Sequence, residues 1–186
     1  MMKTSTWLKI YRSLGRLTKR QDLVQFSADN PQPQRLLFLF PLNPAIFYES
    51  LHIVKRLAIY PPQNNIHFAV ALNLKDIMHA TDHLTFYYPF MKDDTPKIDL
   101  DVLVARFGNE KYDAVINLDV EPSIQMAKLI SKIETPKRIG FSGPGADELY
   151  NIQIAPVSQR YLSGAYDQIL GFCDLGKPLA KLQGAE

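Results

Sequence analysis

The sequence predicts an α/β protein with a doubly wound, mainly parallel Rossmann-like sheet and an N-terminal helical extension. Short, continuous apolar runs are typical of strands that are buried on both faces of a parallel sheet. Stretches with apolar residues at helical spacing separate these runs, which indicates repeated βα units. At 186 residues, the chain is long enough for one well-buried core and too short for two ordinary domains.

The strands are expected wherever an apolar run is bounded by polar or turn-forming residues. The first run, RLLFLF, has no polar residue after Arg35, and the fourth, YDAVINL, has the strongest strand composition. The predicted strands cover residues 35–40, 66–72, 84–88, 112–118, 138–141 and 151–155.

The helices are expected in the segments between these strands. Asn43 and Pro44 mark the start of the first of them, apolar residues at helical spacing continue to Leu57, and Pro61 and Pro62 end it. The other predicted helices cover residues 73–82, 98–107, 122–133 and 161–172. We therefore divide the chain into a helix and connector (1–33), a Rossmann-like domain (34–175) and a tail (176–186).

The charge is distributed unevenly along the chain. Six of the 21 basic residues fall in residues 1–20, which hold no acid, and residues 21–186 carry 15 basic and 19 acidic residues. An acidic body without a recognition motif argues against nucleic-acid binding. The single Cys173 excludes an internal disulfide and favours the reducing cytoplasm.

The first twenty residues predict a basic amphipathic helix. On a helix, Trp7, Ile10, Tyr11, Leu14 and Leu17 share one side. Such a helix can dock on an acidic protein partner or on an anionic membrane surface, at the cytoplasmic face of a membrane. Alternatively, it packs its apolar side on its own domain and leaves the basic side in solvent. The predicted docking residues are Trp7, Lys9, Arg12, Arg16, Lys19 and Arg20.

A ligand crevice is expected beyond the carboxyl ends of the strands, as in other open α/β sheets. Asp119 and Glu121 place two carboxylates there, suited to acid–base or metal chemistry. The alternative is that they end a strand and stabilise the start of the next helix. The candidate ligand-binding residues are Asn43, Asn73, Asp119, Glu121 and Ser142.

Other motifs give no cofactor or metal site. His79, Asp82 and His83 have helical spacing that suits zinc, but the sequence offers no convincing fourth ligand, and we favour solvated polar side chains in a loop or at a helix end. The segment SGPGAD, 142–147, lacks the Lys-Ser/Thr pair of a phosphate loop, and no G-x-G-x-x-G follows the first strand. We interpret this glycine-rich segment as a turn, and expect neither cofactor nor metal.

The segment YDAVINLDVEPSIQMAKLISKIETPKRIGFSG, 112–143, resembles glycosyltransferase family 9, the heptosyltransferases. Tyr112, Asp113 and Leu118 stand where that family has a strand, and the RIGF run stands where it has the next. The resemblance covers about residues 35–172. It implies the acceptor-side domain of a two-domain glycosyltransferase whose second domain binds the nucleotide-sugar donor.

The sequence departs from that family at two points. The loop after the family's first strand carries a Gly-Asp pair whose aspartate is taken as the catalytic base, whereas this chain has FPLNPAI, 40–46. Asn43 is the nearest polar residue, and a neutral amide cannot accept a proton from a hydroxyl group. The donor-binding domain is also expected where this sequence ends. We therefore predict no catalytic residue and no sugar transfer by this chain alone.

Three functions fit these observations. The first is a non-catalytic binding or structural subunit, derived from a glycosyltransferase-like half-domain, that docks onto a larger protein complex, either in solution or at a membrane. The second is the acceptor-binding half of a split glycosyltransferase for lipopolysaccharide or a related glycan. The third is a small-molecule-binding module that uses the crevice near Asp119 and Glu121.

Overall fold

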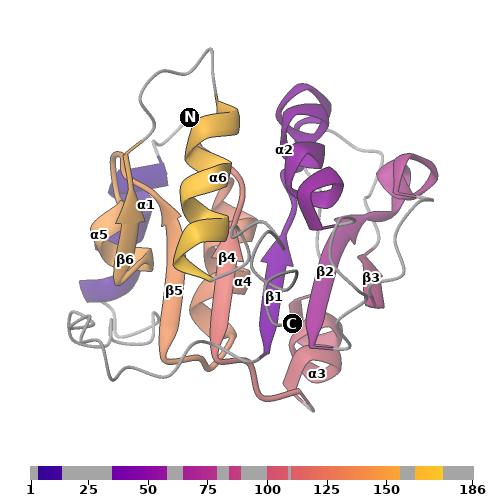
Figure 1. The fold of residues 1–186 in the computed structure, drawn as a ribbon. Coiled ribbons are helices and arrows are strands. Elements are labelled where there is room, and N and C mark those ends of the chain that lie inside the picture. Colours follow the sequence, from indigo (N-terminus) through magenta and orange to yellow (C-terminus); the bar gives the residue numbers. More distant parts are fainter. Residues whose placement is uncertain are drawn as a thin grey trace, which may run out of the picture.

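The computed structural model describes residues 4–13, 35–57, 65–78, 84–88, 100–108, 110–155 and 162–173. These ranges form a single sheet with helices on both faces (Figure 1). The strands are β1 (Leu36–Leu39), β2 (Ile66–Ala71), β3 (Leu84–Tyr88), β4 (Ala114–Asn117), β5 (Lys137–Phe141) and β6 (Ile152–Ile154). The helices are α1 (Thr4–Ser13), α2 (Pro44–Leu57), the 3₁₀ helix η1 (Leu72–Ile77), α3 (Leu100–Gly108), α4 (Ile124–Lys132), α5 (Ala146–Leu149) and α6 (Leu162–Phe172).

The sheet confirms the predicted doubly wound α/β class. Its order is β3-β2-β1-β4-β5-β6, and every pair of neighbouring strands is parallel. Phe38 of β1 lies opposite Phe68 of β2 and Ile116 of β4, so the apolar runs form the centre of the sheet. The chain reverses its direction of winding between β1 and β4, which makes their carboxyl ends the topological switch point.

The helices form a layer on each face of the sheet (Figure 1). α2 and α6 pack against each other on one face, whereas α3 contacts α4 on the other. All four residues of β1 and of β4 are buried. Burial on both faces explains why these strands are continuously apolar and do not alternate between apolar and polar residues.

The N-terminal helix α1 lies against the helices of the Rossmann-like domain. It packs on α4 and α5, and the side chains of Trp7 and Leu8 are only 6% and 1% exposed. The Lys128 ammonium group lies 5.2 Å from the centroid of the Trp7 ring, in the geometry of a cation–π contact. In this structure the N-terminal helix therefore packs described apolar residues on its own domain.

Several element boundaries differ from the predicted ones. The helix predicted from residue 122 begins at Ile124, because Ser123 is its N-cap: the Ser123 hydroxyl oxygen accepts a hydrogen bond from the Met126 N–H at 3.2 Å. The segment predicted as a helix over 73–82 forms η1 over Leu72–Ile77, and residues 79–83 lie outside the described ranges. The four-residue helix α5 was not predicted, because its sequence was interpreted as a turn.

Candidate functional site

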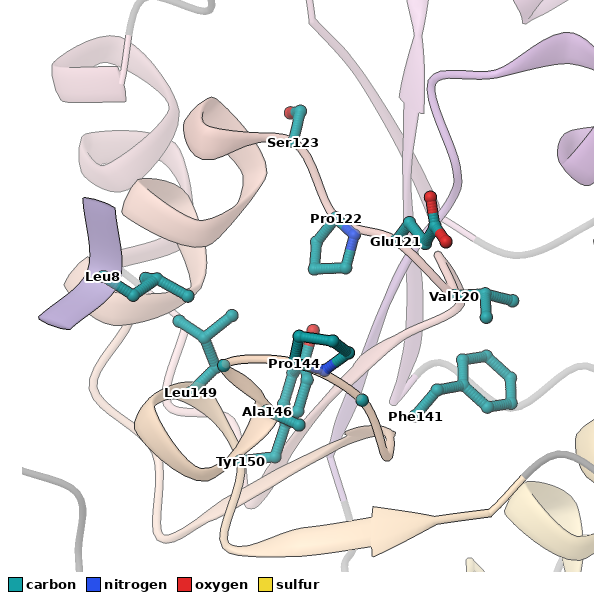
Figure 2. A pocket seen from close by; sticks show the side chains of 12 residues that line it. Leu8, Val120, Glu121, Pro122, Ser123, Phe141, Pro144, Ala146, Leu149 and Tyr150 are labelled. Atoms are coloured by element: carbon teal, nitrogen blue, oxygen red, sulfur yellow. The ribbon is translucent and has the colours of Figure 1, made fainter. Parts of the chain in front are cut away.

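A pocket of about 250 Å³ opens at the carboxyl edge of β4 and β5. Figure 2 shows Val120 and Glu121 on one side of it, Leu8 and Leu149 on the opposite side, and Pro122 near Pro144 between them. Three parts of the chain therefore meet there: α1, the loop after β4, and the segment from the end of β5 to α5. The complete lining is Leu8, Val120, Glu121, Pro122, Ser123, Phe141, Gly143, Pro144, Gly145, Ala146, Leu149 and Tyr150.

Hydrogen bonds at the end of β4 fix the loop that lines this pocket. The buried Asn117 side chain donates to the Tyr150 hydroxyl oxygen at 2.7 Å and to the main-chain oxygen of Asp119 at 3.2 Å. The Asp119 N–H donates in turn to the Asn117 side-chain oxygen at 3.3 Å. On the other face of the sheet, the Tyr166 hydroxyl group donates to the Leu118 carbonyl oxygen at 3.1 Å. The end of β4 is thus held by side chains from both helical layers.

Asp119 is a buried carboxylate at the switch point. Its residue is only 5% exposed, and its Oδ1 atom accepts a hydrogen bond from the Glu121 N–H at 3.1 Å. Burial raises the pKa of Asp119 from 3.8 to about 6, because desolvation outweighs the stabilising Glu121 N–H, and the charge of Glu121 adds to the rise. A strongly shifted carboxylate at the carboxyl end of a strand marks a candidate functional site.

Both residues lie between the end of β4 and Ser123, the N-cap of α4, as the strand-end interpretation also expects. Asp119 is buried, whereas Glu121 is exposed on the pocket rim. The two carboxylates therefore have different environments despite being two residues apart.

Tyr150 forms part of the pocket wall and is fixed by two close neighbours. Its hydroxyl group bonds Asn117, and its ring lies directly over the backbone of Gly140 in β5, where a side chain would overlap it. Complete burial raises the pKa of the Tyr150 phenol, so the group stays protonated at neutral pH. Gly145, at a φ of 88°, makes the turn into α5, as the turn interpretation of this glycine-rich segment requires.

The other three predicted crevice residues do not line the pocket. Asn43 is exposed, and its side-chain oxygen accepts the Ala45 N–H at 3.0 Å at the start of α2. Asn73 is exposed in η1, and the Ser142 N–H donates to the Ile154 carbonyl oxygen at 2.9 Å in the sheet. Of the five candidates, Glu121 lines the pocket and Asp119 shapes its loop. The side chains of Asn43 and Asp119 thus accept hydrogen bonds from nearby backbone N–H groups, whereas Glu121 lines the pocket.

The structure describes only part of the predicted docking surface. The Lys9 side chain is exposed, but Trp7 is buried, so its indole is not available to a partner while α1 lies on α4 and α5. Arg12 belongs to the backbone of α1, and its side chain is not described. Arg16, Lys19 and Arg20 lie outside the described residues, as do His79, Asp82 and His83 of the zinc hypothesis.

A second, larger pocket of about 600 Å³ lies at the opposite, amino edge of β4 and β5. Its lining includes Lys111, Lys132 and Glu134, and the Arg35–Glu110 ion pair, with an N–O distance of 2.6 Å, lies on one side of it. Parallel α/β sheets bind ligands at the carboxyl edge of the strands, not at the amino edge. We therefore assign the site to the smaller pocket despite its size.

Two classes of feature are not found in the described ranges. No group of three or more His, Cys, Asp and Glu side chains in these ranges is arranged to hold a metal ion. None of the helices that the structure describes has the length and hydropathy required to cross a bilayer.

Sequence reasoning missed most of the pocket wall. Four of the lining residues look like ordinary core residues in the sequence: Leu8, Phe141, Leu149 and Tyr150. The glycines and proline of the segment 143–145 were the available signal, since they mark a turn at the carboxyl end of a strand.

Comparisons of the chain with protein-family models, with curated proteins and with solved structures find no match. The resemblance to glycosyltransferase family 9 therefore stays a prediction.

Proposed function

We propose that this chain is a binding module that holds a small ligand in the pocket at the carboxyl edge of β4 and β5. The buried Asp119 beneath the pocket loop carries this proposal. A buried ionised carboxylate is costly to desolvate, and carboxylates with a pKa raised in this way cluster at functional sites. Its hydrogen bond to the Glu121 N–H connects it to the pocket rim.

The lining favours an uncharged or positively charged ligand with hydroxyl or amino groups. Glu121 is the charged residue among the described side chains that line the pocket, and its carboxylate can accept hydrogen bonds from such groups. Pro122, Pro144 and Leu149 supply an apolar surface for the carbon skeleton. At about 250 Å³, the pocket is smaller than the sites that take drug-sized ligands, so a single sugar ring is a suitable size.

This ligand class agrees with the acceptor-side role implied by the resemblance to glycosyltransferase family 9. A sugar acceptor presents the hydroxyl groups that a rim carboxylate would bind. The Asn43 side chain bonds the start of α2 and supplies no base, so the proposal is for binding and not for transfer.

A panel of monosaccharides and amino sugars tests the proposal by thermal unfolding at pH 7.5. A ligand at about 100 times its Kd should raise the free energy of unfolding by about 2.7 kcal/mol. Glu121→Gln should weaken that ligand about tenfold, because it removes the rim charge. The matched control is Glu134→Gln, which makes the same change at the other pocket. Equal responses in the two variants, or no response of the wild-type protein to any member, would contradict the proposal.

The charge distribution favours a second candidate role, that of a subunit docked on a larger assembly through its N-terminus. Residues 1–20 carry six basic residues and no acid. Exchanging Lys9, Arg12, Arg16, Lys19 and Arg20 for Gln should release the protein from its assembly in cell fractionation without changing its circular dichroism spectrum. An unchanged fractionation pattern would rule out this role. Copurification of a protein with a nucleotide-sugar site would favour the split glycosyltransferase instead.

A further inference from the structure

The helix α1 is a wall of the pocket as well as the predicted docking element. Leu8 lines the pocket, and Figure 2 shows its side chain pointing toward Leu149 of α5. Trp7 is buried beside it, with the Lys128 ammonium group over the indole ring. We call the surface of α4 and α5 that contacts α1 the seat. While α1 occupies the seat, Leu8 closes one side of the pocket.

Among the described side chains of α1, Trp7 and Leu8 are buried at the seat. Lys9 beside them is exposed, and Ile10 is 43% exposed. A single helix that packs on the outside of other helices is the type of element that opens locally while the core stays folded.

The residue composition around Trp7 matches an anionic bilayer. Basic amphipathic helices bind such surfaces by burying Trp and other apolar side chains between the headgroups, with Lys and Arg beside them. Each basic residue near an anionic leaflet strengthens binding about fivefold. Residues 1–20 supply six of them without an opposing acid.

Trp7 cannot be buried in the seat and in a bilayer at the same time. We propose that α1 exchanges between the seat and an anionic bilayer, and that its departure removes the Leu8 wall and opens the pocket. Membrane binding and pocket closure are then alternative states of one helix. By linkage, whatever favours one state disfavours the other to the same extent. This inference deepens the docking role proposed above and does not depend on the identity of the pocket ligand.

Trp7 reports directly on the exchange, because it is the sole tryptophan of the chain. The full chain is mixed with vesicles of phosphatidylcholine containing about 30% phosphatidylglycerol and brominated acyl chains, which quench tryptophan only on contact. We expect quenching of Trp7 by these vesicles and none by pure brominated phosphatidylcholine. In the same mixture, hydrogen exchange of residues 143–149 should become faster, because the pocket side covered by Leu8 is exposed.

Two variants separate docking from exchange. In Leu8→Cys/Leu149→Cys, a short thiol crosslinker locks α1 to its seat, and the buried Cys173 does not compete. We expect quenching before crosslinking and its loss afterwards. Leu149→Ala weakens the seat without altering α1, and should strengthen vesicle binding about fivefold, or about 1 kcal/mol. The matched control is Leu103→Ala, a buried leucine of α3 away from the seat.

The outcomes distinguish failure of the two ideas. Absence of quenching in every variant, or binding to polyglutamate in place of vesicles, would contradict the membrane role. Equal quenching of the crosslinked and free proteins would show that bilayer binding does not require α1 to leave its seat, and would overturn the exchange while leaving the docking role intact. An equal gain from Leu149→Ala and Leu103→Ala would also overturn it.

Discussion

Replacing Asp119 with asparagine is expected to stabilise the protein by about 3 kcal/mol at pH 7.5. Burial raises the pKa of this carboxyl group from 3.8 to about 6. The folded protein therefore holds the proton more tightly than the unfolded chain does. The stability that protonation contributes is fully present below pH 3.8 and is lost as the pH rises through about 6. The asparagine side chain carries no charge to desolvate, and its oxygen can still accept the Glu121 N–H.

Urea unfolding at several pH values measures this effect. The difference between Asp119→Asn and the wild-type protein should be largest above pH 6 and fall below about 0.5 kcal/mol near pH 4. Glu121→Gln, at an exposed carboxylate two residues away, is the control and should change stability by no more than about 0.5 kcal/mol at either pH. An Asp119→Asn protein that is less stable than the wild type at pH 7.5 would show that the carboxylate is a net stabilising group.

A gain in stability from Asp119→Asn would indicate that the carboxylate is kept for a reason other than folding. Stabilising substitutions recurrently cost function where activity depends on a destabilised active site. If Asp119→Asn is both more stable and impaired in ligand binding, the buried carboxylate belongs to the site.

Replacing Gly140 with alanine is expected to destabilise the protein by about 3 kcal/mol. An added methyl group would come within 2.6 Å of Cε2 of the Tyr150 ring, which is buried and held by the hydrogen bond between its hydroxyl group and Asn117. The ring would have to shift, and its hydrogen bond to Asn117 would be strained with it. Because Tyr150 lines the pocket, the substitution should also alter ligand binding.

A double-mutant cycle checks the cause. Tyr150→Ala alone removes a large buried ring and should cost about 3–5 kcal/mol. Adding Gly140→Ala to that variant should cost little more, because the methyl group then has space. Gly171→Ala in α6 is the control: nothing lies within 4 Å of its added carbon, so the helix should gain about 0.5–1 kcal/mol. Equal losses from Gly140→Ala with and without Tyr150 would show that the ring is not responsible.

The architecture could be predicted from the sequence because it depends on local patterns. A run such as LLFL has no polar alternation, and this indicates burial on both faces of a parallel sheet. Once the strands and helices are known, the handedness of βαβ crossovers restricts the topology to a few arrangements. Boundaries were less predictable. Pro122 suited the first turn of a helix, but the hydroxyl group of Ser123 caps it one residue later.

The site was predicted only in part, because burial and long-range packing are not encoded locally. Asp119 and Glu121 look alike in the sequence, yet one is 5% exposed and the other lies on the surface. Tyr150 and Tyr166, distant in the sequence, approach the end of β4 from opposite faces of the sheet and bond Asn117 and Leu118 there. Trp7 is the type of residue that binds at a membrane interface. Its contact with Lys128, more than a hundred positions away, could not be deduced from spacing in the sequence.

The most direct test of the binding proposal is to map ligand contacts residue by residue. A library of small sugars and amines is titrated into isotope-labelled protein, and the chemical shifts of the backbone amides are followed by NMR. We predict that binders shift the amides of residues 120–123 and 143–149, and that Glu121→Gln raises the Kd obtained from those shifts about tenfold. Binders that shift only residues around the amino-edge pocket, such as Lys111 and Thr135, would contradict the assignment of the site to the carboxyl edge of β4 and β5.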